Sequence, residues 1–175
     1  MVEEQRHHRL GEVYLGVGEF GEDVSAVLAE IIKALLKGPY RLRSFVVFGS
    51  RARGDWKPWG DTDVVIIIDG LDKPLRWRAL WELDLPEDVV NKAHDIELEA
   101  RVFTPEEFEE MLRSFSLTAL DALEEGVVLY DDGFWRKMRA VFERMERDGL
   151  VKRIDGGWKV VISDAPSKRA RAYRC

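Results

Sequence analysis

Two aspartates separated by one residue stand directly before an apolar run in this sequence. Asp61 and Asp63 flank Thr62, and residues 64–68 are all valine or isoleucine. In an extended chain, residues two apart project from the same face, roughly 7 Å from each other. Carboxylate oxygens are the preferred ligands of hard cations such as Mg²⁺, which also bridge to phosphates. The pair alone is more typical of aspartates that cap turns in a loop, and a third carboxylate beside it would favour a cation site at the start of a buried strand.

A second polar feature precedes the aspartates. Gly49 and Ser50 follow the apolar residues 45–48, which predict a strand, and the next residues, Arg-Ala-Arg-Gly, indicate the first turn of a short helix. Glycine lets a ligand approach the main chain, unpaired N–H groups attract anions, and a serine hydroxyl adds a hydrogen bond. These residues form either an ordinary turn after a strand, which is the commoner case, or a phosphate contact. Arg51 and Arg53 either join it or lie on the exposed side of the helix.

A third carboxylate for the cation site is expected from a later strand. Apolar residues alternate with charged ones over residues 95–102, which predicts a strand with one buried and one acidic face. The charged positions are Asp95, Glu97, Glu99 and Arg101. Thr104, Pro105 and Glu107 then predict a helix that starts with a capping box. If this strand pairs with residues 64–68, its acidic face brings a carboxylate to Asp61 and Asp63.

The remaining patterns predict the elements that must hold this site. Apolar residues at helical spacing from Val24 to Leu36 predict a helix that ends at Gly38, and further helices are expected within 75–93, up to Leu123, and within 134–149. Residues 127–131 predict a short strand, and the turn at 155–157 predicts a hairpin. The expected class is α+β, a small mixed β-sheet flanked by helices. We expect three parts: an N-terminal segment (1–20), a core (21–115), and a C-terminal part (116–175). The C-terminal part would consist of helices, a hairpin and a basic tail packed on the core.

Composition narrows the classes of function. The chain has 175 residues and a net charge of −6, which disfavours a broad nucleic-acid surface. No apolar run is long enough for a membrane span, so we expect a cytoplasmic protein without a membrane partner. The single cysteine, Cys175, offers no disulfide or cysteine metal cluster. The basic residues 167–174 are either a solvated end or an arm that contacts phosphate.

The segment from Phe45 to Ile68, with "GSRARGDWKPWGDTD" at its centre, resembles the signature of the nucleotidyltransferase superfamily. This superfamily includes DNA polymerase beta, kanamycin nucleotidyltransferase and small stand-alone nucleotidyltransferases. The resemblance implies a polymerase-beta-like palm fold. It also implies that Asp61 and Asp63 bind two Mg²⁺ ions, and that Gly49 and Ser50, with Arg53 nearby, hold the phosphates of a nucleoside triphosphate.

The resemblance extends to "VFTPEEFEEM", which is similar to the segment after the family's third carboxylate. By distance from this segment the matching position is Glu99, with Glu97 as the alternative. The family usually has aspartate there, and the glutamate of this chain is longer by one methylene. Glu99 would complete one of the two metal sites and count, with Asp61 and Asp63, as a catalytic residue.

The implied activity is transfer of a nucleoside monophosphate, expected to be AMP from ATP, to a hydroxyl acceptor. Stand-alone members often work beside a small helical protein of the HEPN type in toxin–antitoxin pairs, which implies such a partner here. The alternative is a non-catalytic nucleotide- or partner-binding module, favoured by the glutamate at the third position. A homodimer is left open, and nucleic acid is not the favoured partner.

Aromatic and histidine residues near these motifs have competing interpretations. Trp56 and Trp59 either stack on a base or pack the loop onto the sheet, and packing is favoured. His7 and His8 are not favoured as metal ligands. The hairpin after the last helix resembles the wing of a winged-helix module, but too few helices precede it.

Overall fold

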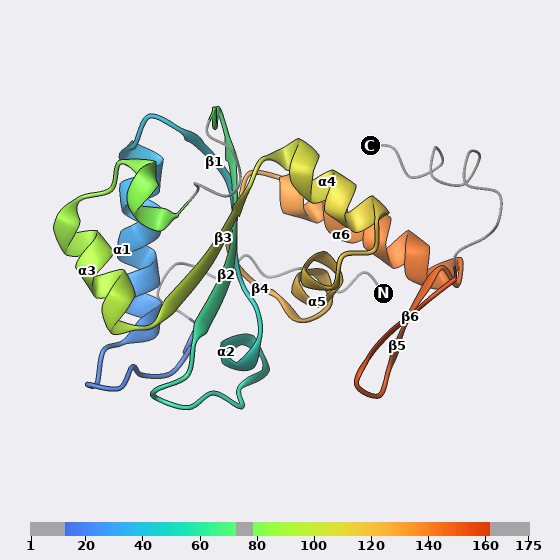
Figure 1. Cartoon of the computed structure of the whole chain (residues 1–175), viewed down its shortest axis with the longest axis horizontal. Coiled ribbons are helices and arrows are strands. Elements are labelled where there is room, and N and C mark those ends of the chain that lie inside the picture. Colours follow the sequence, from blue (N-terminus) through green and yellow to red (C-terminus); the bar gives the residue numbers. More distant parts are fainter. Residues whose placement is uncertain (1–12, 73–78, 162–175) are drawn as a thin grey trace.

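A four-stranded mixed sheet separates two layers of helices in the computed structural model, which describes residues 13–72 and 79–161 (Figure 1). Strands β1 and β2 are antiparallel, β4 pairs antiparallel with β1, and β3 runs parallel to β2. The expected α+β class with a small mixed sheet is confirmed. In the spatial order β3-β2-β1-β4, the strands are β3 (Leu98–Phe103), β2 (Thr62–Asp69), β1 (Arg41–Val47) and β4 (Val127–Asp131).

One face of the sheet is covered by α1 (Val24–Lys37) and α3 (Glu87–Asp95), which lie together on that side (Figure 1). Helix α1 begins at an Asp23 cap and places its apolar stripe on the sheet, as its spacing predicts. A 3₁₀ turn, η2 (Leu80–Leu83), adds two buried leucines to the same core.

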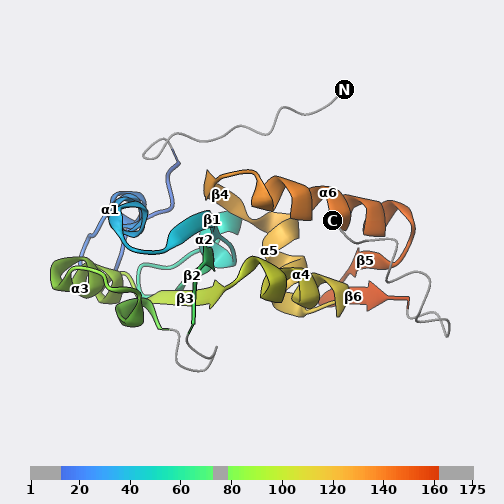
Figure 2. The ribbon, with the colours of Figure 1, turned by 90° about the horizontal axis from the view of Figure 1, so that it is seen from above.

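The other face is covered by α4 (Pro105–Arg113), α5 (Leu117–Glu125) and α6 (Phe134–Arg147), which lie on the opposite side of the sheet in the view from above (Figure 2). Thr104 and Glu107 form the predicted capping box at the start of α4. Side chains from all three helices share one apolar core with β1 and β2. Helix α5 is therefore packed firmly against the strands that carry the sequence motifs.

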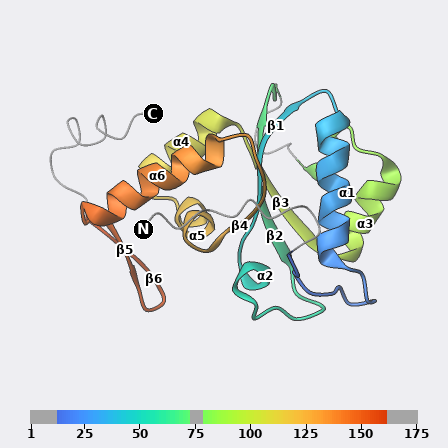
Figure 3. The ribbon, with the colours of Figure 1, turned by 180° about the vertical axis from the view of Figure 1, so that it is seen from behind.

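Beyond α6 the chain forms a two-stranded hairpin of β5 (Val151–Ile154) and β6 (Gly157–Val160), which extends away from the sheet (Figure 3). Trp158 packs edge-on against Phe142 of α6, with ring centroids 5.7 Å apart. Its indole N–H donates to Asp121 of α5 at 2.8 Å, and Arg153 pairs with the same carboxylate at 2.6 Å. Helix α5 thus connects the hairpin to the rest of the fold.

The strand predicted over residues 95–102 is shorter in the structure. Asp95 ends α3, Glu97 has a φ of 47°, and β3 begins only at Leu98. Ile96 is 1% exposed and fills the core at this turn. A buried apolar residue at this position is compatible with a helix end as well as with a strand. The alternation of apolar and charged residues therefore predicted a strand that starts too early.

Several predictions concern residues outside the described ranges. They involve His7, His8, Cys175 and the basic residues 167–174.

Candidate active site

Gly49 lies where β1 gives way to a short helix, α2 (Ser50–Arg53), directly beside Asp63. Its φ is 70°, and a Cβ added there would lie 2.7 Å from Asp63 Oδ2. Both the backbone conformation and the close approach require glycine. The main-chain N–H of Phe48 donates to the Asp63 carbonyl at 3.0 Å, which fixes the two segments together. The predicted phosphate contact and the aspartate pair therefore share one edge of the sheet.

Glu99 is the acidic residue that the fold places beside Asp63. Strands β2 and β3 are parallel, and their register sets Asp63 opposite Glu99. Asp61 precedes β2 and is exposed, whereas the Asp63 side chain is 22% exposed. Glu97 lies outside the strand on a left-handed turn. The structure thus brings Asp61, Asp63 and Glu99 to one edge, with Glu99 rather than Glu97 directly opposite Asp63.

Thr62 fixes the positions of the three acidic residues from within the core. It lies between the aspartates, is fully buried, and its hydroxyl donates to the Ile96 carbonyl at 2.7 Å. Its N–H donates to the Glu97 carbonyl at 2.9 Å. These bonds lock the start of β2 to the turn before β3, so the positions of the acidic residues are held by the core.

Arg101 lies between two of these carboxylates. Its Nη2 is 3.5 Å from Asp63 Oδ1 and 3.3 Å from Glu99 Oε1. Its Nη1 donates to the Thr118 hydroxyl of α5 at 3.3 Å, and the guanidinium lies 5.2 Å from the Phe48 ring centroid. Burial raises the pKa of Asp63, Arg101 lowers it, and the neighbouring Glu99 and Asp61 raise it again, leaving it above its ordinary value.

In the described part of the chain, no three histidine, cysteine, aspartate or glutamate side chains stand ready to hold a metal ion. The donor chemistry nevertheless fits Mg²⁺, since three carboxylates lie on one edge and a guanidinium already balances two of them. The Glu99 side chain is 54% exposed and Asp61 is exposed, so both have room to turn toward Asp63. Binding by these residues requires that Arg101 leave its place.

The predicted phosphate contact is occupied by a carboxylate of the chain itself. Glu125, the last residue of α5, accepts from the Gly49 N–H at 2.9 Å. The same oxygen, Oε1, accepts from Arg53 Nη1 at 2.8 Å. Arg53 also lies 3.4 Å from Asp55. We call Gly49, Ser50 and Arg53 the cradle; the Gly49 N–H and the Arg53 guanidinium donate to this one anionic oxygen.

Arg51 and Trp56 have structural roles: Trp56 packs the loop, as favoured, whereas Arg51 neither joins the phosphate contact nor lies on the exposed side of the helix. Arg51 is 2% exposed, and its guanidinium donates to the carbonyls of Leu15, Val17 and Gly60. Burial lowers its pKa. Trp56 packs so closely on Gly16 that a Cβ there would lie 2.3 Å from the indole. Together they bind the loop of residues 55–60 to the N-terminal segment, while Trp59 is 64% exposed.

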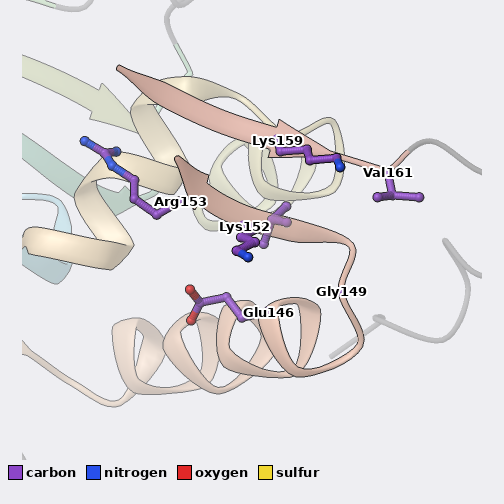
Figure 4. A pocket seen from close by; sticks show the side chains of 7 residues that line it. Glu146, Gly149, Lys152, Arg153, Lys159 and Val161 are labelled. Atoms are coloured by element: carbon purple, nitrogen blue, oxygen red, sulfur yellow. The ribbon is translucent and has the colours of Figure 1, made fainter. Parts of the chain in front are cut away.

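Next to the carboxylates is an open depression of about 230 Å³ lined by Asp61, His94, Glu97, Leu98 and Glu99. The His94 ring is stacked on Trp81, with centroids 6.2 Å apart. A larger depression, of about 360 Å³, lies between α6 and the hairpin, where Glu146 projects from the helix toward Lys152 (Figure 4). Lys152 and Lys159 are cross-strand partners there. This second depression carries charges of both signs, unlike the acidic one.

Sequence reasoning missed Arg101, Thr118 and Glu125 as residues of the site. Arg101 had a signal, because it lies two residues after Glu99 on the same strand face. Thr118 and Glu125 had none, since nothing in the sequence tells which face of α5 reaches the strands.

Within the described ranges, no helix combines the length and apolar character needed to cross a membrane.

Comparison with known proteins gives one family. The model of the nucleotidyltransferase domain matches residues 27–129, which include every element of the site. No curated protein matches the chain. Among solved structures, a toxin–antitoxin complex with AMP-PNP is 21% identical with a TM-score of 0.46, and covers 69% of this chain and 87% of that one. Two mutants of the toxin–antitoxin MntA-HpeT are 17% and 18% identical to this chain, with TM-scores of 0.46 and 0.44. Each match spans 69% of this chain and, respectively, 87% and 86% of the other chain.

Proposed function

Because this chain belongs to the nucleotidyltransferase domain family, we propose that it transfers AMP from ATP, with Mg²⁺, to a hydroxyl group of an acceptor. The acceptor is either a small molecule or a protein that docks on the chain. The observation that carries this proposal is the register that sets Glu99 opposite Asp63. Asp63 is two residues from Asp61 and lies against Gly49. Cation and phosphate groups are then adjacent, as phosphoryl transfer requires.

In this proposal the residues of the chain bind and orient the triphosphate. The Gly49 N–H, the Ser50 hydroxyl and the Arg53 guanidinium donate to its terminal phosphates. Gly49 leaves room for those phosphates next to Asp63, because any side chain there would meet the carboxylate. Asp61, Asp63 and Glu99 would hold Mg²⁺, which when bound neutralises phosphate charge and lowers the pKa of the acceptor hydroxyl.

The reaction is an in-line displacement. A bond forms between the acceptor oxygen and the α-phosphorus, and the bond from that phosphorus to the oxygen bridging to the β-phosphate breaks. The hydroxyl proton leaves to solvent or to a carboxylate, and pyrophosphate departs from the cradle. The open depression beside Asp61 and Glu99 leaves a path for the acceptor to this edge of the sheet.

A second candidate is a nucleotide- or partner-binding module without turnover. Two observations favour it: the glutamate at the third position, and Arg101 in ion pairs with Asp63 and Glu99. A cation already in that place reduces the need for a metal. In both candidates we expect a small helical partner of the HEPN type, as in a toxin–antitoxin pair.

The test is incubation of the protein with each nucleoside triphosphate, labelled at the γ-phosphate, with Mg²⁺ and candidate acceptors. We expect pyrophosphate release by the unchanged protein and at least a 10³-fold loss in D61N and D63N, an order of magnitude typical of removing a metal ligand. D72N removes an exposed aspartate beyond the far end of β2 and should behave as the unchanged protein. No release with any nucleotide would leave only the binding module.

A further inference from the structure

The cradle holds a carboxylate in the position of a phosphate oxygen. One oxygen of Glu125 accepts from both the Gly49 N–H and Arg53 Nη1, at 2.9 and 2.8 Å. The Glu125 side chain is only 15% exposed, so its contact with the cradle is largely shielded from solvent. Two donors converging on one anionic oxygen is also how a terminal phosphate would be bound there.

The position of Glu125 in its own helix makes the contact more informative. It is the last residue of α5, where the helix dipole disfavours negative charge, and Glu124 precedes it. Arg53 does not depend on it, since Asp55 lies 3.4 Å away. The cradle donors are thus what holds this carboxylate in an otherwise unfavourable place.

We propose that Glu125 is an internal competitor of the triphosphate: it closes the cradle in the nucleotide-free protein and must leave before phosphate binds. The proposal rests on the proposed function, because it assigns the cradle to the triphosphate. Displacement frees both donors at once, since a single oxygen occupies them. Nucleotide affinity is then set partly by how strongly Glu125 holds the cradle.

The side chain of Glu125, rather than the whole of α5, is the part that moves. Four residues of the helix are buried in the core: Ala119, Leu120, Ala122 and Leu123. A Cβ on the following Gly126 would lie 2.2 Å from the Ala122 carbonyl and 2.6 Å from Val46. The helix is therefore fixed on β1, whereas rotation about the side-chain bonds of Glu125 suffices to open the cradle.

The test is the affinity of E125Q for a non-hydrolysable ATP analogue and for inorganic tripolyphosphate, each with Mg²⁺, by titration calorimetry. Glutamine keeps the size of the side chain and removes its charge, so we expect about tenfold tighter binding of both probes. E124Q removes the same charge one residue away, outside the cradle, and should bind as the unchanged protein does. Equal tightening in E124Q would show a general charge effect and overturn the proposal.

A second measurement guards against a folding defect. Tripolyphosphate should raise the melting temperature of E125Q, and of E125A, more than that of the unchanged protein. Weaker binding by E125Q would overturn the competitor role and would assign Glu125 to positioning Arg53. Equal binding by the unchanged protein and E125Q overturns this inference alone. No binding by either overturns the proposed nucleotide site as well.

Discussion

At one end of the candidate site a cation lies among carboxylates, and at the other a carboxylate lies among donors. Arg101 contacts Asp63 and Glu99 at 3.5 and 3.3 Å, and its side chain is 34% exposed. Glu125 contacts Gly49 and Arg53 at 2.9 and 2.8 Å, and it is 15% exposed. The anion end is held by shorter bonds in a drier place, so its occupant should be harder to displace.

The difference follows from the elements that supply each group. Arg101 comes from β3 itself and lies over the edge that it neutralises, whereas Glu125 comes from α5, across the sheet face. Helix α5 reaches both ends, because Thr118 near its start accepts from Arg101 and Glu125 ends it. Metal entry and phosphate entry therefore disturb two contacts of the same helix.

The largest effect is expected at Gly49, where the two ends meet. In G49A the added methyl would lie 2.7 Å from Asp63 Oδ2 on a backbone with a φ of 70°. We expect a loss of more than 10²-fold in pyrophosphate release and about 2 kcal/mol of stability, as strained positions show. G54A is the control, because Gly54 has a φ of 84° but nothing within 4 Å. It should lose stability by about 1 kcal/mol through backbone strain and keep turnover.

The next effect separates the two glutamates that the sequence offered. E99Q should lower kcat by about 10²-fold, because it removes a charge directly opposite Asp63. E97Q should change kcat less than threefold, since Glu97 lies outside the strand. Steady-state pyrophosphate release measures both. A larger loss in E97Q would transfer the third carboxylate to the turn before β3.

Replacement of Arg101 tests how firmly the cation end is held. R101M removes the charge that competes with a metal for Asp63 and Glu99, so Mg²⁺ should bind about tenfold more tightly. Calorimetric titration with Mg²⁺ alone is the measurement, with R113M as control, because Arg113 contacts Glu109 and Glu110 within α4. Weaker Mg²⁺ binding would mean that Arg101 orders the carboxylates instead of competing for them.

The smallest effect is a pH dependence of stability. Burial keeps the pKa of Asp63 above its ordinary value of 3.8, so the folded protein favours the protonated form. Ionised Asp63 therefore lowers stability as the pH rises through its pKa, and this loss is absent below pH 3.8. Without Mg²⁺, D63N should be more stable than the unchanged protein at pH 7, where Asp63 is ionised. Urea unfolding at pH 7 and at pH 4 should show the advantage shrink in acid.

Much of the fold was predictable because its signals are local. The apolar spacing of α1, the capping box of α4 and the apolar run of β2 each specify an element from neighbouring residues. The resemblance to the family, counted from Thr104, offered Glu99 with Glu97 as the alternative. The assumption that β2 and β3 are neighbours is confirmed, and their register, which the sequence left open, sets Glu99 opposite Asp63.

The occupants of the site were not predictable, because they depend on packing between distant segments. Glu125 is 76 residues from Gly49 in the chain, and its contact exists because α5 lies on β1. The start of β3 was misplaced because a buried Ile96 satisfies a strand pattern and a helix end alike. A left-handed residue such as Glu97 has no sequence signal when it is not glycine.

The buried hydroxyl of Thr62 has a consequence for the choice between ions. By binding the Ile96 carbonyl it joins two backbone segments that carry acidic side chains, so neither can drift outward to enlarge the ligand shell. Mg²⁺ accepts a small, regular set of oxygens near 2.1 Å, whereas Ca²⁺ needs more of them at longer range. Because this hydrogen bond holds the two segments in place, the site should bind Mg²⁺ in preference to Ca²⁺. T62V, which removes the bond, should reduce that preference for Mg²⁺.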